Sequence, residues 1–349
     1  MSVRASRARR IDPRALAASG LDWLAQRRHG TRVFSLVRIG YGATTIFMLL
    51  VNLPVRQRIW GAEAAYTWDL FMQTSLAGGQ PSLFVLSSSA LYADVLYFAL
   101  LIAAILFTVG WHTRVITIVF FVLLWSLQAR NPLATNGGDN LSRIILVYMV
   151  FAQVGAHWSL DALRSRRRRV AGAPRRREWV LGTVAHNAAL LACIAQVCVL
   201  YATSSLFKVQ GEMWQNGTAL YYILRTADYN SWPEVTALIY QWPIVVVGAT
   251  YAAVFVQLCL PLALVNPWAK AILLPLVLGM HIAIGVLMGL PFFSLFMVVS
   301  DLFFLTDREV RLARVYVASA LSRVWGGRPT PVPTVPAAVH TASAQAVAE

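Results

Sequence analysis

Apolar residues are gathered into eight long runs, which short polar or basic segments separate. The runs lie at 33–53, 90–110, 114–129, 141–158, 183–206, 235–264, 269–289 and 291–306. Because a helix needs about 20 apolar residues to cross the hydrocarbon core of a bilayer, the pattern predicts eight transmembrane helices. The third, fourth and eighth runs are short, so we expect those helices to be tilted, half-inserted or packed inside a bundle.

Composition indicates the same class. The chain has 349 residues, of which 58% are hydrophobic and only 13% are charged, and this balance is outside the usual range of soluble globular domains. The predicted fold class is therefore an all-α integral membrane protein, with about eight transmembrane helices in one bundle and membrane lipids around it.

The net charge of +15 indicates the membrane topology, because most basic residues fall in three segments: before the first run, after the fourth and after the eighth. Cytoplasmic loops carry such an excess of Lys and Arg, so we expect both termini in the cytoplasm and no nucleic-acid partner. We predict three parts: a basic disordered tail (1–30), a membrane domain (31–310) and a mostly disordered cytoplasmic tail (311–349).

The segments that then face outward are 54–89, 130–140, 207–234 and a tight turn near Pro291. The first contains several aromatic residues and few charges, so we expect it to lie on the membrane surface as a cap. Its aromatic side chains are interpreted as interfacial anchors in preference to substrate contacts; they are Trp60, Tyr66, Trp68 and Phe71.

The second outward segment ends in "NGGDN" (136–140), directly before the fourth apolar run. One amide or carboxylate would suffice to cap a helix, and glycines allow a tight turn. Three such side chains crowd one turn beside a cation, so a binding site in addition to the cap stays open. The residues of this first candidate cluster are Asn136, Gly137, Gly138, Asp139, Asn140 and Arg143.

The third outward segment begins in "YATSSLFKVQGEMWQNGTALYY" (201–222). Lys208 precedes Glu212 by four residues, which is compatible with an ion pair along one helical face. A lysine that is partly withdrawn from water can instead act as a base. Lys208, Glu212 and Trp214 form the second candidate cluster, and both roles stay open.

Four ionisable residues lie inside predicted spans, where a bilayer makes them costly. Arg38 and Asp301 lie towards cytoplasmic ends, and Asp94 lies near the outer end of the second span. His281 has no second ligand at metal-binding spacing, so we interpret it as a packing residue and expect no metal site. The three cysteines all fall inside spans and do not form a disulfide framework.

Together, four segments resemble the HTTM family, the horizontally transferred transmembrane domain. They are "FSLVRIGYGATTIFML" with Arg38, "NPLATNGGDNLSRIILVY", "YATSSLFKVQGEMWQNGTALYY" and "MHIAIGVLMGLPFFSLFMVVSDLFFL". The resemblance covers about residues 30–310. This family is related to vitamin K-dependent gamma-carboxylase and to the bacterial sporulation-delaying protein B.

The resemblance implies a function. In the carboxylase, a lysine on the luminal side deprotonates a reduced quinone, and Lys208 falls on that motif. "NGGDN" resembles the bacterial members, which mature an exported toxin peptide alongside partner proteins. We therefore expect a protein of a bacterial plasma membrane that modifies or matures an exported peptide, with Lys208 as base and Asp139 positioning it. The alternative is a non-enzymatic membrane partner that binds or shelters a peptide or lipid.

Overall fold

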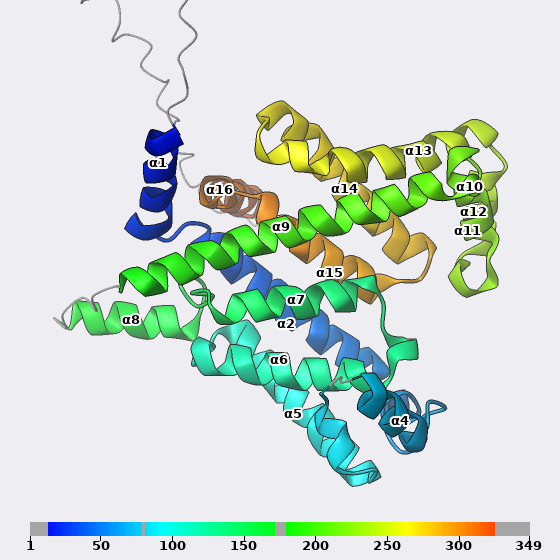
Figure 1. Ribbon diagram of the computed structural model, residues 1–349, viewed down its shortest axis with the longest axis horizontal. Coiled ribbons are helices and arrows are strands. Elements are labelled where there is room, and N and C mark those ends of the chain that lie inside the picture. The colour runs from blue at the N-terminus through cyan, green and yellow to red at the C-terminus, as the bar shows by residue number, and fades with distance from the viewer. Residues whose placement is uncertain (1–12, 79–80, 172–178, 325–349) are drawn as a thin grey trace, which may run out of the picture. The chain divides into compact units, whose positions relative to one another are not determined.

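The structure is a computed structural model that describes residues 13–78, 81–171 and 179–324, and every regular element in these ranges is a helix (Figure 1). The chain divides into two compact units, Met1–Leu305 and Thr306–Glu349. The first unit holds every predicted span apart from the last residue of the eighth. In the second unit, the described part is a single helix, α16 (Asp307–Val324).

Six helical segments in the described ranges are long and apolar enough to cross a membrane, and they make the chain a multi-pass helical membrane protein. The segments are Thr31–Ile59 (α2, Thr31–Asn52, continuing through α3, Arg56–Ile59), Ala90–Val109 (α5), Thr113–Arg130 (α6), Val180–Gln210 (α9), Pro243–Leu264 (α13, Pro243–Cys259, and a 3-10 turn) and Pro267–Leu287 (α14). Each coincides with one of the predicted apolar runs. The helical class is thus confirmed.

The fourth and eighth predicted runs form shorter helices. Helix α7 covers Gly137–Val150, and α15 (Pro291–Asp301) continues as a 3-10 turn over Leu302–Phe304. Fourteen residues extend only about 21 Å, against a hydrocarbon core of about 30 Å. Helix α7 ends early because the segment after it turns back, and the backbone oxygen of Val154 there accepts from Arg38.

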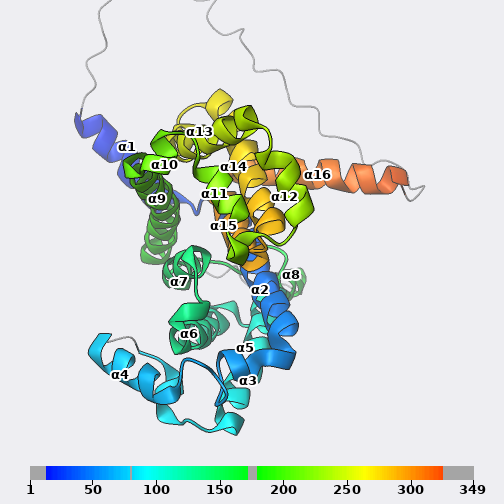
Figure 2. The same cartoon turned by 90° about the vertical axis from the view of Figure 1, so that its right-hand side faces the viewer.

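The short helix α15 lies among longer ones. It packs against α2, α7 and α14, and both views show it running between α2 and α14 (Figures 1 and 2). Helix α2 also packs on α5, α5 on α6, α6 on α7, α7 on α9, and α9 on α13. Helix α15 therefore contacts two helices that precede α9 in the chain, α2 and α7, and one that follows it, α14.

The run predicted at 235–264 is two helices. Helix α12 covers Pro233–Tyr240, and α13 begins at Pro243. Proline has no backbone N–H to donate and is tolerated in the first turn of a helix, so Pro243 starts a new helix instead of continuing the old one. Two further short helices precede α12, α10 (Glu212–Gln215) and α11 (Ala219–Arg225).

The terminal segments are more ordered than expected where the structure describes them. Residues Pro13–Gln26 form helix α1, within the predicted disordered tail, and α1 packs on α9. The buried side chain of Asn187 on α9 donates to the backbone oxygens of Leu24 (2.9 Å) and Arg27 (2.8 Å). Helix α16 likewise occupies part of 311–349, and the remainder of both predicted tails, 1–12 and 325–349, lies outside the described residues.

Candidate functional site

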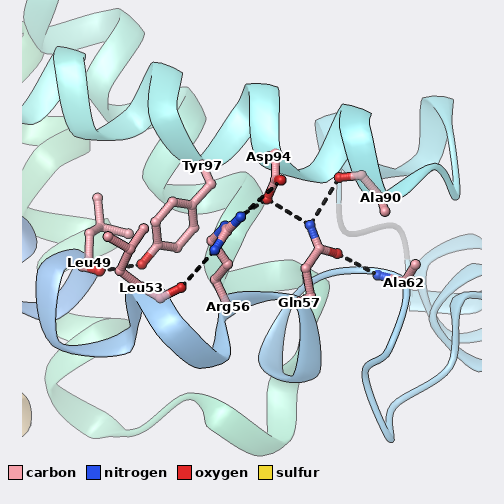
Figure 3. A network of polar contacts seen from close by, with 8 residues as sticks. All are labelled: Leu49, Leu53, Arg56, Gln57, Ala62, Ala90, Asp94 and Tyr97. Atoms are coloured by element: carbon pink, nitrogen blue, oxygen red, sulfur yellow. Dashed lines mark hydrogen bonds and ion pairs between the residues drawn. The ribbon is translucent and has the colours of Figure 1, made fainter.

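Asp94 belongs to a clamp that fastens the first outward segment to α5. Its carboxylate accepts from Nε of Arg56 at 2.7 Å, from Nη2 of Arg56 at 3.1 Å and from Gln57 at 2.7 Å (Figure 3). Gln57 also donates to the backbone oxygen of Ala90. A bidentate arginine of this kind fixes geometry, so Asp94 has a structural role.

The same segment is held from a second side by Arg130, at the end of α6. This buried guanidinium donates to the backbone oxygens of Tyr66 (2.8 Å) and Gly61 (3.1 Å) and lies over the ring of Phe71. Trp60, Tyr66 and Phe71 are themselves buried. The interpretation of these three aromatic residues as interfacial anchors is wrong, because they form the core beneath the segment.

Arg38 is fully buried and serves as a cap for helix ends. Its guanidinium donates to the backbone oxygens of Phe107 (2.6 Å), Thr108, Val154 (3.1 Å) and Trp158 (2.6 Å). The first two belong to the last turn of α5, where helix carbonyls lack intrahelical partners and a cation is favoured. The arginine thus joins α2, α5 and the turn after α7.

Asp139 and Asn136 make a reciprocal cap at the start of α7. The side chain of Asn136 accepts from the backbone N–H of Gly138 (2.9 Å) and Asp139 (3.2 Å), and Asp139 accepts from the backbone N–H of Asn136 (2.9 Å). Gln128 donates to the other carboxylate oxygen at 3.0 Å. Burial raises the pKa of Asp139 to about 6, although these hydrogen bonds and Arg143 favour the charged form.

The other members of the "NGGDN" cluster have separate positions. Asn140 is exposed and accepts from Arg143, whose guanidinium lies over the ring of Trp125. A Cβ atom on Gly138 would lie 2.9 Å from the backbone oxygen of Phe293. Gly138 therefore lets α7 approach α15 closely, and an exposed Gly137 precedes it.

Lys208 is partly buried near the end of α9, and its ammonium group has neutral partners. It donates to the hydroxyl of Ser204 at 2.6 Å and to the side-chain oxygen of Gln257 at 2.8 Å, and it lies 5.4 Å from the ring centroid of Trp214. No carboxylate pairs with Lys208 among the residues that the structure describes. Gln257 is buried on α13 and also reaches Met280.

The ion pair between Lys208 and Glu212 that the spacing allows does not form among the described residues. Helix α9 ends at Gln210, and Gly211 has an extended backbone (φ −85°, ψ 129°) before α10 begins at Glu212. Residues four apart share a face only in a continuous helix. Glu212 is exposed, and it enters no salt bridge within the described ranges.

The two predicted clusters are not joined directly. No hydrogen bond or ion pair within 13–78, 81–171 and 179–324 links Asp139 to Lys208. Between them lies His281 on α14, which contacts the ring of Phe293 and follows Met280 in the chain. Phe293 is the residue against which Gly138 packs, so His281 and the first cluster share a neighbour.

His281 belongs to a buried polar group that the sequence did not suggest. The hydroxyl of Tyr201 on α9 is 2.8 Å from Nε2 of His281, and it donates to Oδ1 of Asp301 at 2.8 Å. Asp301 had been expected near a cytoplasmic helix end. One signal was present in the sequence: Tyr201, Ser204 and Lys208 recur at helical spacing on one face of α9.

No group of three His, Cys, Asp or Glu side chains gathers to hold a metal ion in the part of the chain that the structure describes. A lateral groove of about 280 Å³ lies between α7 and α9, lined by Tyr148, Phe151 and four alanines of α9. Its lining is apolar, so it suits lipid tails and offers no catalytic group.

Comparison with known proteins gives one relative. "Uncharacterized protein YitO" from Bacillus subtilis (strain 168) is 22% identical over 309 residues, which cover 85% of this chain and 92% of the relative. No family model and no solved structure matches the chain. The likeness extends over most of the chain, whereas the resemblance to the HTTM family stays a prediction.

Proposed function

We propose that this chain is an HTTM-type protein of a bacterial plasma membrane that modifies or matures an exported peptide at its outer face. In this proposal α7 and α15 complete eight passes with the six long spans, and both termini are cytoplasmic. The clustering of basic residues before α2, after α7 and after α15 supports that topology. Accessory maturation proteins would act beside it.

The observation that carries the proposal is the environment of Lys208. Its ammonium group is partly withdrawn from water and bonded to two neutral oxygens, those of Ser204 and Gln257. A lysine without a carboxylate partner loses its proton more readily than one in an ion pair. Lys208 can therefore serve as a base towards a weakly acidic group, such as the hydroxyl of a reduced quinone that enters from the bilayer.

Asp139 takes a different role from the one expected of it. Both its oxygens are occupied by the cap of α7 and by Gln128, so we propose that it positions α7 and that Lys208 alone is the reacting group. The second candidate function is a non-enzymatic partner that binds a peptide or lipid. The apolar groove between α7 and α9 supports that alternative.

The test is mass spectrometry of peptides exported by cells that carry the wild-type protein, a deletion, Lys208→Ala or Lys208→Arg. Arginine keeps the charge but supplies no usable base. We expect both variants to lose a peptide, or a mass change on one, to the same extent as the deletion. The mass difference would identify the reaction.

The matched control is Lys270→Ala, because Lys208 and Lys270 are the two lysines of the chain. Membrane levels of every variant are measured alongside. Full activity of Lys208→Arg at a normal membrane level would overturn the catalytic base and favour the binding partner. A deletion without any effect on exported peptides would overturn both candidate functions.

A further inference from the structure

Tyr201, His281 and Asp301 form a continuous chain of hydrogen bonds across α9, α14 and α15. The Tyr201 hydroxyl donates to Oδ1 of Asp301 and is 2.8 Å from Nε2 of His281. All three side chains are buried, with exposures of 0 to 1%. Lys208 and Tyr201 are seven residues apart on α9, so the chain lies about 10 Å deeper than the lysine.

The direction of these hydrogen bonds follows from the single proton of the hydroxyl. Because Tyr201 donates that proton to Asp301, its oxygen must accept from His281, whose Nε2 then carries a hydrogen. A neutral imidazole has one protonated nitrogen, so Nδ1 is an unprotonated acceptor. Nδ1 of His281 and Oδ2 of Asp301 have no hydrogen-bond partner among the described residues.

The charge of this group is also unusual. No cation forms a salt bridge with Asp301 in the described parts of the chain. An ionised carboxylate that is buried without a cation is strongly disfavoured. One additional proton on the three side chains removes that cost, and the two unpartnered atoms provide places for it.

We propose that Tyr201, His281 and Asp301 are an intramembrane proton-binding site, in which a proton enters at Nδ1 of His281 and comes to rest on Asp301. No ligand other than a proton is required, because the three side chains are closely packed by their neighbours. The proposal is independent of whether Lys208 is a base.

The transfer balances in three steps. A proton binds Nδ1 of His281; the hydrogen on Nε2 moves to the oxygen of Tyr201; the former hydroxyl hydrogen moves to Oδ1 of Asp301. The site then holds a neutral carboxylic acid, a neutral tyrosine and the other histidine tautomer, with one proton gained and no electron transferred. Reversal of the steps releases the proton.

Other titratable groups face this site from the helices packed around it. Tyr41 on α2 bonds Ser300, the neighbour of Asp301, at 2.7 Å. Helix α9 contributes Cys193 and Lys208. Helix α7, which packs on α9 and α15, carries Asp139. Of these, Asp139 is the second buried carboxyl, so an experiment that observes protonated carboxyl groups must separate the two.

Infrared difference spectroscopy tests the proposal on the full chain in phosphatidylcholine vesicles, in H2O and in D2O and over a range of pH. We expect a protonated carboxyl band in the wild type that shifts in D2O and is lost in Asp301→Asn. Tyr201→Phe should shift the band, because the protonated Oδ1 loses the tyrosine oxygen to which it donates, and should slow its deuterium exchange. Asp139→Asn and Asp94→Asn are the matched controls and should retain the band.

Where Asp301→Asn does not fold, wild type labelled with ¹³C-aspartate keeps the proposal testable: the band must move with the label and respond to Tyr201→Phe. Two results would overturn the proposal. One is a spectrum without any protonated carboxyl band that depends on Asp301 or on Tyr201. The other is an exchange rate at Asp301 that His281→Gln and Tyr201→Phe both leave unchanged, since the relay through them would then be wrong.

Discussion

Charged side chains are satisfied in different ways in the two parts of the membrane domain. From α2 to α7, Arg38 donates to four backbone oxygens, Asp94 accepts a bidentate arginine, and both oxygens of Asp139 accept hydrogen bonds. From α9 to α15, Lys208 has neutral partners and Asp301 keeps one oxygen unpartnered. The first part uses its charges to hold helices together, and the second retains groups able to exchange protons.

This difference divides the predicted site residues into those that hold the fold together and those that are candidates for function. Arg38, Asp94 and Asp139 are each tied to the fold by two or more hydrogen bonds. Lys208 and His281 instead bond side chains on neighbouring helices, Gln257 on α13 and Tyr201 on α9. Nδ1 of His281 and Oδ2 of Asp301 have no hydrogen-bond partner among the described residues, and because an unsatisfied polar group in a protein interior costs free energy, this supports the proton-binding role proposed for them.

We expect the largest loss of stability from a substitution in the first part of the membrane domain, α2 to α7. Arg38→Met removes all donors to the four backbone oxygens, each of which costs about 1–3 kcal/mol when it is buried without a partner. We expect the free energy of unfolding to fall by at least about 3 kcal/mol, measured by thermal unfolding in a neutral detergent. Lys208→Met is the matched removal of a cation and should change stability by less than about 1 kcal/mol.

A comparable loss in both variants would remove the distinction between the two parts. Arg38→Lys separates the contribution of charge from that of donor geometry. Lysine keeps the charge but lacks the planar guanidinium that donates to several carbonyls at once. We expect Arg38→Lys to recover only part of the stability. Full recovery would mean that charge alone, and not the arrangement of donors, holds α5 against the turn after α7.

We expect a smaller effect from the titration of Asp139. Burial raises the pKa of this carboxyl to about 6. The native state then holds a proton between about pH 4 and 6 that the unfolded state has released, so its stabilising contribution is lost as the pH rises through this window. We expect up to about 2–3 kcal/mol of this loss, at about 1.4 kcal/mol per pKa unit. Thermal unfolding of wild type and Asp139→Asn from pH 4 to 7 measures it.

The asparagine variant retains an oxygen that can accept from Asn136, so the cap is preserved while the titration is removed. The difference between the two stability curves isolates Asp139 from all other carboxylates. A difference that does not vary with pH would mean that Asp139 titrates normally, and α7 would then begin in a wetter environment than the structure indicates.

The helical class and the six long spans could be predicted because hydrophobicity over 20 residues is a local property. Helices α7 and α15 were overestimated in length, since neither the turn bound by Arg38 nor the 3-10 end of α15 leaves a mark in the local pattern. The break between α12 and α13 could have been found, because Pro243 is visible in the sequence.

The candidate site was predictable in part. The sequence identified both Asp139 and Lys208, and the cap at Asp139 follows from a local rule, whereas the partner of Lys208 on α13, Gln257, lies 49 residues away in the chain. The group of Tyr201, His281 and Asp301 was missed because His281 and Asp301 lie 80 and 100 residues after Tyr201 in the chain. The three side chains meet only where three helices pack together. Arg130 was missed because its partners are backbone oxygens, which no side-chain pattern encodes.

The smallest expected effect is a coupling energy near zero between Lys208 and Glu212. The spacing alone predicts an ion pair worth about 0.3–0.5 kcal/mol, whereas Gly211 ends the helix between the two residues. In a double-mutant cycle with Lys208→Met and Glu212→Gln, we expect the stability changes to add within about 0.3 kcal/mol.

A matched cycle of Arg56→Met and Asp94→Asn should show clear coupling, because those side chains form two hydrogen bonds. Coupling in the first cycle and none in the second would reverse the assignment of structural and functional charges to the two parts of the membrane domain.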